Sequence, residues 1–398
     1  MNKQQRSSAF VPHDLRAPIT GNPNGPLAGL TAAIKDMYDI AGERTGGGNP
    51  EWLAAHAPAK ETSWAVQQWL DAGVDVIGKT ICDEFFYSVT GMNPHYGTPR
   101  NARAPRHLPA GSSSGSAAAV ASGACDIALG SDTGGSVRIP AAVQGIYGIR
   151  TTHGRVSMVG AMAMAPTFDA LGWFASSPGL LRKAASPLLG RRGPAAPPSR
   201  LLLTDDGFAE ADQPVQTFLK SFLARSAGVL PGAQNITVAA DGLGAWRECV
   251  RTIQAREVWA QYGPWIEEHQ PKLEQGIRER FTYAASITEE AGTKARVMMA
   301  EIRKYLRGLI SPGVILVLPT APSIAPGLDV TPGDLQTFRL RVMSLTCTAG
   351  LGGLPQVSLP VGTVTGCPVG ISFVGAEGAD EELLDLAVLL GPYCGAGD

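Results

Sequence analysis

Two glycine-framed serine turns lie close together in residues 111–140, which read GSSSGSAAAVASGACDIALGSDTGGSVRIP. The first turn, residues 111–116, has small side chains that let backbone and hydroxyl groups approach a ligand, and the small residues after it predict a tightly packed helix. In the second turn, residues 131–136, two glycines precede Ser136. Consecutive backbone N–H groups can therefore converge beside its hydroxyl, an arrangement that suits a developing oxyanion.

Three other interpretations of these turns are weaker. A flexible linker needs neither an apolar helix between its turns nor the ordered chain that residues 137–140 predict. The pattern G-x-S-x-G centres a nucleophile elbow on Ser113, but an elbow follows directly on a strand, and residues 101–109 form a proline-broken loop with only His153 and His269 downstream as partners. A phosphate-binding loop would need a Lys-Ser or Lys-Thr pair to close the glycine run.

The order of a Gly-Ser-Ser turn, a small-residue helix and the run GSDTGGSVRIPA resembles the signature of the amidase signature family of serine hydrolases. In that family the last serine of the glycine-glycine-serine turn is the acyl-forming nucleophile, and an earlier serine, on a cis peptide bond, bridges it to an upstream lysine base. The resemblance implies that Ser136 is the nucleophile and Ser112 the bridge. Ala110 and Ser114 stand where the family commonly has glycine, and these small substitutions bear on loop shape rather than on chemistry.

Lys35 follows short apolar runs that predict a buried strand with a lysine at its edge. Desolvation at that edge would lower the lysine pKa and leave a neutral fraction that can accept a proton. The alternative is an ordinary solvated lysine whose stem covers apolar surface. The family's base lies in a matching Ile-Lys-Asp context, so the resemblance assigns that role to Lys35.

Amide hydrolysis needs an activated nucleophile, a stabilised oxyanion and a proton for the leaving nitrogen. In the expected mechanism neutral Lys35 withdraws a proton through Ser112 as Ser136 attacks the carbonyl, and the relay returns the proton to the amine before water cleaves the acyl-enzyme. We expect the oxyanion to be held by backbone N–H groups of Thr133, Gly134 and Gly135.

The residues flanking these groups have two possible roles each. Phe86 and Tyr87 fall in a segment that commonly lines the substrate pocket in the family, although an aromatic pair is more often core. Asp132 and Arg138 flank the second turn and are expected to pair and brace it. The second-ranked role for Arg138 is recognition of a substrate carboxylate.

The composition excludes several classes of protein. The chain has 398 residues, 44% of them hydrophobic, and a formal net charge of −2, which gives no general attraction for nucleic acid or anionic membranes. No apolar run is long enough to span a bilayer, and the first 18 residues lack the apolar centre of a secretory signal, so we expect a cytoplasmic protein.

The six cysteines and six histidines are scattered along the chain without paired or CxxC spacing. This pattern predicts reduced, mostly buried thiols rather than disulfides or a zinc site. We therefore expect no metal and no cofactor.

Helical and strand patterns alternate along the chain and no repeat is visible. They predict one α/β domain over residues 1–398, and the resemblance supports a large mixed β-sheet covered by helices on both faces. The basic, proline-rich residues 182–200 predict an exposed loop rather than a nucleic-acid patch, because they lack interleaved aromatics. Residues 246–309 are expected to be helical, broken at Pro264 and Pro271, and their aromatic residues form either core or a cap over the site.

The chain is short and resembles the compact family members that include indole-3-acetamide hydrolases. The resemblance implies a small-molecule aryl- or alkyl-acetamide substrate and, at family level, a homodimer. Two rival functions are a glutaminase subunit of a tRNA amidotransferase, which needs partner subunits, and a noncatalytic interaction protein on the same fold. Retention of Lys35, Ser112 and Ser136 favours catalysis.

Overall fold

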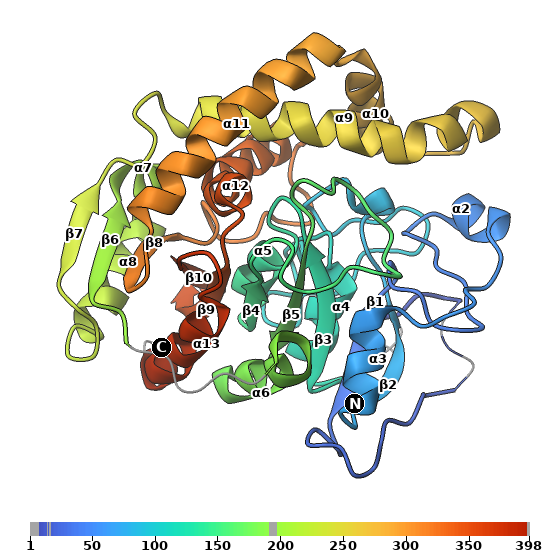
Figure 1. Ribbon diagram of the computed structural model, residues 1–398, viewed down its shortest axis with the longest axis horizontal. Helices are drawn as coiled ribbons and strands as arrows, with labels where there is room; N and C mark the ends of the chain where they lie inside the picture. The colour runs from blue at the N-terminus through green and yellow to red at the C-terminus, as the bar shows by residue number, and fades with distance from the viewer. Residues whose placement is uncertain (1–7, 14, 16, 191–196, 396–398) are drawn as a thin grey trace.

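The computed structural model describes residues 8–13, 15, 17–190 and 197–395 (Figure 1). Within these residues one mixed sheet of ten strands runs across the molecule. In sheet order its strands are β2 (Asp75–Thr80), β1 (Thr31–Lys35), β3 (Ile127–Asp132), β5 (Ala170–Ala175), β4 (Tyr147–Arg150), β9 (Gln356–Val364), β10 (Cys367–Val374), β8 (Val314–Pro319), β6 (Arg200–Thr204) and β7 (Ala233–Ile236).

The two ends of the sheet are parallel and its centre is antiparallel. Strand β1 pairs in parallel with both β2 and β3, and β6 pairs in parallel with β7 and β8. The strands between β3 and β8 pair antiparallel throughout. Strands β1 and β3 therefore run in the same direction, and their carboxyl ends, which carry Lys35 and Asp132, meet at one edge of the sheet.

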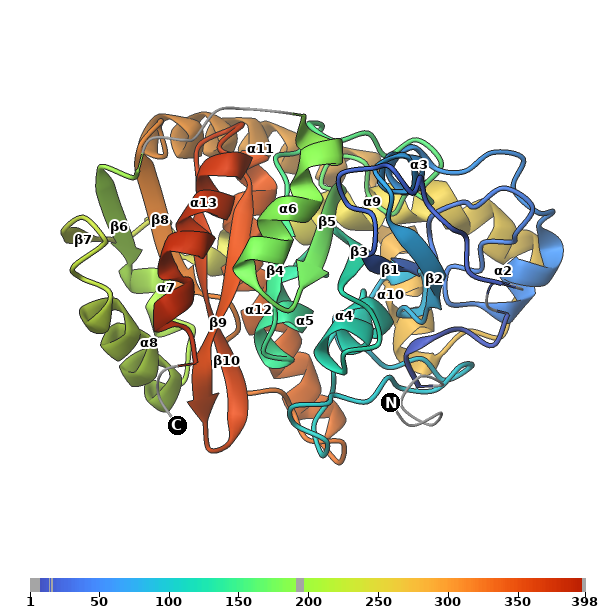
Figure 2. The same ribbon diagram turned by 90° about the horizontal axis from the view of Figure 1, so that it is seen from below.

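Helices cover both faces of the sheet (Figures 1 and 2). Helices α3, α6 and α13 lie on one face, and α9 to α12 lie on the other. The helices of the described chain are α2 (Pro50–Ala55), α3 (Trp64–Asp71), α4 (Ser114–Ala121), α5 (Arg138–Val143), α6 (Pro178–Leu189), α7 (Asp205–Ala209), α8 (Gln213–Arg225), α9 (Leu243–His269), α10 (Gln275–Ser286), α11 (Glu289–Leu309), α12 (Pro332–Gly352) and α13 (Asp380–Leu390), with short 3₁₀ turns η1 (Glu84–Phe86) and η2 (Gly391–Tyr393). The predicted α/β class and mixed sheet are confirmed.

The prediction of a loop over residues 182–200 is wrong for its first part, because helix α6 extends to Leu189. Ser177 caps this helix by accepting a hydrogen bond from Leu180 N, and its proline at the first turn is compatible with a helix start. A stripe of buried aliphatic residues outweighs the proline and arginine content that predicted a loop. Residues 191–196 lie outside the described residues.

Residues 246–309 are largely helical, but the predicted break at Pro264 is wrong. Helix α9 continues through Pro264 to His269 and ends at Gln270, which has a left-handed backbone before Pro271. Proline removes one backbone donor, and the burial of Val258 and Tyr262 on the same helix offsets that loss. None of the helices in the described ranges is long and apolar enough to cross a membrane.

Small residues let the first serine turn lie directly on strand β3. Helix α4 is composed of Ser, Gly, Ala and Val and is almost wholly buried against this strand. At Gly130 an added Cβ would lie 2.9 Å from Ser113 Oγ and 2.9 Å from a Phe174 ring carbon. Glycine at this position therefore sets the distance between the strand and the turn.

We expect Gly130→Ala to lower the free energy of unfolding by about 1–3 kcal/mol, because the methyl group must displace Ser113 or Phe174 from a close-packed region. Urea titration would measure the change. Gly179→Ala is the matched control, because an added Cβ there meets nothing within 4 Å. Equal stability of Gly130→Ala and the unmodified protein would contradict this description of the packing.

Candidate active site

Lys35 is fully buried at the carboxyl end of strand β1. Its ammonium donates hydrogen bonds to two hydroxyl oxygens, Ser112 Oγ and Ser131 Oγ, each at 2.8 Å. Ser112 comes from the turn before α4, and Ser131 comes from strand β3, the parallel neighbour of β1. The parallel pairing thus brings together Lys35 and Ser131, which lie 96 residues apart in the chain.

Burial lowers the pKa of Lys35 to about 8. The cost of desolvating the ammonium is the largest cause, and it outweighs the opposing effect of Cys82 and of the carboxylates of Asp83, Asp132 and Asp169. The sequence-based expectation of a lowered lysine pKa is confirmed in direction. A lysine with this pKa is partly neutral near pH 7 to 8 and can therefore accept a proton.

The Gly111–Ser112 peptide bond is cis. Next to it, Ser113 N donates to Ser136 O at 3.3 Å, which joins the two serine turns, and Ser113 Oγ donates to the carbonyl of Ser131 at 3.2 Å. Ser113 is buried and held by the backbone of β3, so it has the position of a structural serine and not of an elbow nucleophile.

Ser136 lies at a cavity, here called the serine cavity, which it lines with Gly134, Phe86, Tyr87, Met164 and Met343. Phe86 also lies beside Lys35, with its ring centroid 5.0 Å from Lys35 Nζ. Within the described residues no hydrogen bond joins Ser112 Oγ to Ser136 Oγ. Catalytic hydrogen bonds of this kind often tighten only when substrate is bound.

One of the three expected oxyanion donors already donates a hydrogen bond to another group in the protein. Gly135 N donates to Asp132 Oδ1 at 2.9 Å, so it points into the turn and not toward the serine cavity. Gly135 has a φ of +114°, and an added Cβ would lie 2.8 Å from Thr346 Cγ2. Across the described part of the chain, the N–H groups of Thr133 and Gly134 donate to no other group and remain available to a ligand.

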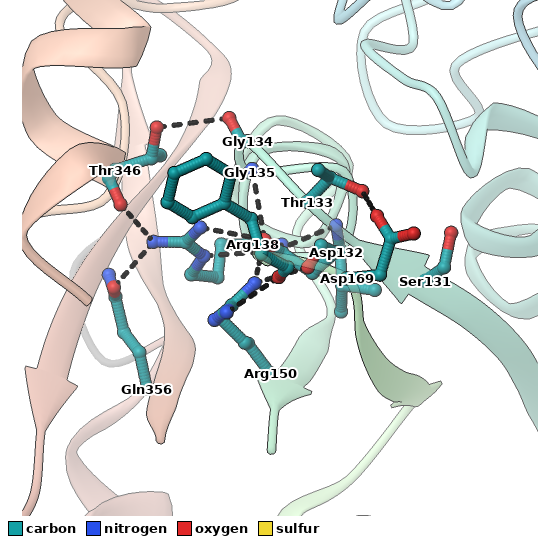
Figure 3. Close-up of polar contacts among 12 residues, drawn as sticks. Ser131, Asp132, Thr133, Gly134, Gly135, Arg138, Arg150, Asp169, Thr346 and Gln356 are labelled. Carbon is teal, nitrogen blue, oxygen red and sulfur yellow. Dashed lines mark hydrogen bonds and ion pairs between the residues drawn. The ribbon is translucent and has the colours of Figure 1, made fainter. Parts of the chain in front are cut away.

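The second turn is built around the buried carboxylate of Asp132 (Figure 3). Asp132 accepts hydrogen bonds from the backbone N–H groups of Gly135, Val137 and Arg138 and from the Arg138 guanidinium, which contacts both carboxylate oxygens. Arg150 donates to the Asp132 carbonyl and lies 3.3 Å from its carboxylate. Burial by itself raises the pKa of Asp132, but Arg138 and Arg150 hold that pKa far below its ordinary value.

Arg138 is a brace, as the first-ranked prediction stated. Its guanidinium is fully buried and also donates to Thr346 O and Gln356 Oε1, which ties the turn to helix α12 and strand β9 (Figure 3). The alternative role, recognition of a substrate carboxylate, is excluded because the donors of Arg138 are held by protein acceptors away from the serine cavity.

Several residues that shape the site were not predicted from the sequence. Ser131 is the second hydroxyl on Lys35, and Thr133 Oγ1 donates to the buried Asp169 at 2.6 Å (Figure 3). Thr346 Oγ1 donates to Gly134 O at 2.9 Å. The neighbouring signature could have indicated Ser131, but Asp169 and Thr346 reach the site only through the sheet and through α12.

Comparison with known proteins identifies the family. The model of the family described as Amidase matches residues 4–184 and 214–384. The chain is 37% identical over 417 residues to Amidase 1 of Arabidopsis thaliana, covering 97% of this chain and 98% of that protein. It is 33% identical to the chloroplastic outer envelope protein 64 of the same organism, covering 92% of this chain and 67% of that protein.

Among solved structures, one described as the crystal structure of an amidase superposes with a TM-score of 0.85 at 28% identity, covering 93% of this chain and 86% of the other. The fold and these relatives thus define a hydrolase of carbon–nitrogen amide bonds built on a mixed β-sheet covered by helices. The chain belongs to the amidase family.

We expect Arg138→Met to lower the free energy of unfolding by about 3 kcal/mol or more, because it leaves the buried Asp132 carboxylate with too few partners. Arg296→Met is the control. Its side chain is 48% exposed in a surface pair with Glu257, and its loss is expected to cost less than about 1 kcal/mol. Chemical denaturation of both variants measures the difference, and equal losses would contradict the bracing role.

Proposed function

We propose that the protein hydrolyses a small carboxylic amide, an aryl- or alkyl-acetamide such as indole-3-acetamide, to a carboxylate and ammonia through Lys35, Ser112 and Ser136. The observation that carries the proposal is the 2.8 Å bond from buried Lys35 Nζ to Ser112 Oγ, next to the cavity that Ser136 lines. A lysine with a pKa near 8 in this position supports the role of general base.

In this mechanism neutral Lys35 accepts the proton of Ser112 while Ser112 accepts the proton of Ser136, whose oxygen attacks the amide carbonyl. Collapse of the tetrahedral intermediate breaks the carbon–nitrogen bond, and the relay returns the proton to the nitrogen so that ammonia leaves. Water then attacks the Ser136 ester and releases the acid. The free N–H groups of Thr133 and Gly134 support stabilisation of the oxyanion, each worth about 3 kcal/mol of barrier.

The apolar part of the lining of the serine cavity supports an apolar group next to the scissile amide. Phe86, Met164 and Met343 present aromatic and thioether surfaces beside Ser136. Such side chains favour a flat or extended apolar group over a polyhydroxylated one, because a buried polar group without a partner is costly. Phe86 is thereby retained as a candidate substrate-contacting residue.

A cytoplasmic location is also proposed. All six cysteines are free thiols and five are buried, which is typical of a protein in a reducing compartment. Cell fractionation would test the location, and light scattering would test the homodimer that remains a family-level prediction.

The function is tested by ammonia release from indole-3-acetamide, phenylacetamide, short aliphatic amides and glutamine by the purified chain. We expect release from an aryl or alkyl amide, with a loss of at least about 10³-fold in Ser136→Ala because no acyl-enzyme can form. Ser186→Ala, an exposed serine on helix α6, serves as the matched control. Release from glutamine alone, or unaltered release by Ser136→Ala, would overturn the proposal.

The pH dependence follows from Lys35. Because only the neutral amine accepts a proton, kcat/KM is expected to rise about tenfold per pH unit below its pKa and to level off above about pH 8. Asp83 raises the pKa of Lys35 by its charge, and its own pKa of about 6 means that it is ionised in this range. Asp83→Asn is therefore expected to move the midpoint to lower pH.

The pH–rate profile of each variant provides the measurement. Asp71→Asn, an exposed carboxylate on α3, is the control and is expected to leave the midpoint in place. A midpoint that stays fixed or moves upward in Asp83→Asn would show that the titrating group is not Lys35.

A further inference from the structure

A second cavity, of about 260 Å³, adjoins the serine cavity and shares four lining residues with it: Tyr87, Gln254, Arg339 and Met343. We call it the arginine cavity because Arg251, Arg280 and Arg339 all line it. The shared residues make the two cavities neighbouring compartments. A ligand of moderate length can therefore contact Ser136 with one end and the arginines with the other.

Two of these arginines carry buried donors without acceptors. Among the described residues Arg280 Nε, Arg280 Nη1 and Arg339 Nε are buried and make no hydrogen bond. The hydrogen bond of Arg339 to a side chain is from Nη1 to Gln336 Oε1, at 2.8 Å. Arg138, in contrast, has its donors distributed over Asp132, Thr346 and Gln356. A buried N–H donor without an acceptor is costly, so the cavity favours an added acceptor.

The charged side chains that line the arginine cavity are mostly positive. Glu279 is its acidic lining residue, against three arginines. Arg251 forms an ion pair with Glu248 at 2.6 Å and lies over the Tyr283 ring, so it already has partners within the protein. Burial lowers the pKa of Arg280. Burial, followed by the charge of Arg280, lowers the pKa of Arg339 to about 9. Arg339 is therefore still cationic at neutral pH.

We propose that the arginine cavity binds a carboxylate at the far end of the substrate, so that the preferred substrates are monoamides of dicarboxylic acids. The proposal rests on the proposed amide hydrolysis at Ser136 and refines its substrate class. The scissile amide lies against Ser136, a short apolar stem crosses the surface shared by Tyr87 and Met343, and the carboxylate meets Arg339 and Arg280. A guanidinium fork matches the two carboxylate oxygens, so a carboxylate would accept from the Arg280 and Arg339 donors that have no protein acceptor.

Matched pairs of amides test this assignment, because each pair differs only in a terminal carboxylate or methyl group: malonamate with propionamide, succinamate with butyramide, glutaramate with valeramide, and adipamate with hexanamide. For at least one length we expect kcat/KM of the acid to exceed that of its neutral partner by about tenfold or more, as a charge-assisted contact gives. Higher values for the neutral amide at every length would overturn the proposal.

Substitution of the two arginines tests whether they cause the preference for the acid over the neutral amide. Arg339→Gln and Arg280→Gln are each expected to reduce the ratio of acid to neutral kcat/KM at least about tenfold. Arg278→Gln is the control, because Arg278 lies on the same helix as Arg280, is exposed and lies outside the residues that line the cavity. A ratio that is unchanged in both cavity variants would also overturn the proposal, and thermal melting would verify that each variant is folded.

Measurements of ligand binding test the carboxylate site independently of the proposed amide hydrolysis. Calorimetry of glutaramate and valeramide with the Ser136→Ala protein requires no turnover. Tighter binding of glutaramate that is lost in Ser136→Ala/Arg339→Gln supports the carboxylate site even if no amide is hydrolysed. Hydrolysis of neutral amides with no preferential binding of the acid would leave the amidase function standing and reject the carboxylate site.

Discussion

Burial of the Lys35 amine is the constraint on which the site depends. An ammonium group removed from water is unfavourable, and here it is met by two hydroxyl oxygens, Ser112 and Ser131, rather than by a carboxylate in direct contact. A direct ion pair would hold the lysine protonated, whereas hydroxyl partners leave its pKa near 8. The fold must therefore deliver a buried lysine and two serines to one point while it keeps the nearby acids occupied with other partners.

Two of the nearby acids, Asp132 and Asp169, accept hydrogen bonds that also shape the site. Asp132 is neutralised by Arg138 and Arg150, and its carboxylate fixes the turn that ends at Ser136. Asp169 accepts from Thr133 Oγ1 and from the backbone N–H groups of Met164 and Ala165. The same electrostatic contacts that keep these carboxylates away from Lys35 thus hold the turn that contains Ser136 in place.

Much of this arrangement could be predicted from the sequence because it is local. The composition of the two turns predicted loops that approach a ligand, and the resemblance to the amidase signature assigned roles to Ser112 and Ser136 within them. The apolar residues before Lys35 indicated burial and hence a lowered pKa. The commitment of Gly135 N to Asp132 could not be predicted, because it depends on how a carboxylate folds back inside its own turn. Local composition also gave the wrong result for helix α6 and Pro264, where burial against the sheet and neighbouring helices outweighs proline.

The contacts between distant segments could not be predicted from sequence patterns. Arg280 and Arg339 belong to α10 and α12, which are ordinary helices in the sequence, and they meet only because both helices lie over the same side of the site. Gln356, which holds Arg138, lies 218 residues away from it. Such pairings are set by the order of strands and helices in the folded sheet.

Labelling with a fluorophosphonate, followed by peptide mapping, tests the central claim most directly, because this reagent reacts with an activated serine regardless of the natural substrate. We predict one adduct on Ser136, lost in Ser136→Ala and formed at least about tenfold more slowly in Lys35→Met, since the base that activates the serine is missing. An adduct on Ser113, or labelling of Ser136 at an unchanged rate in Lys35→Met, would contradict the proposed site.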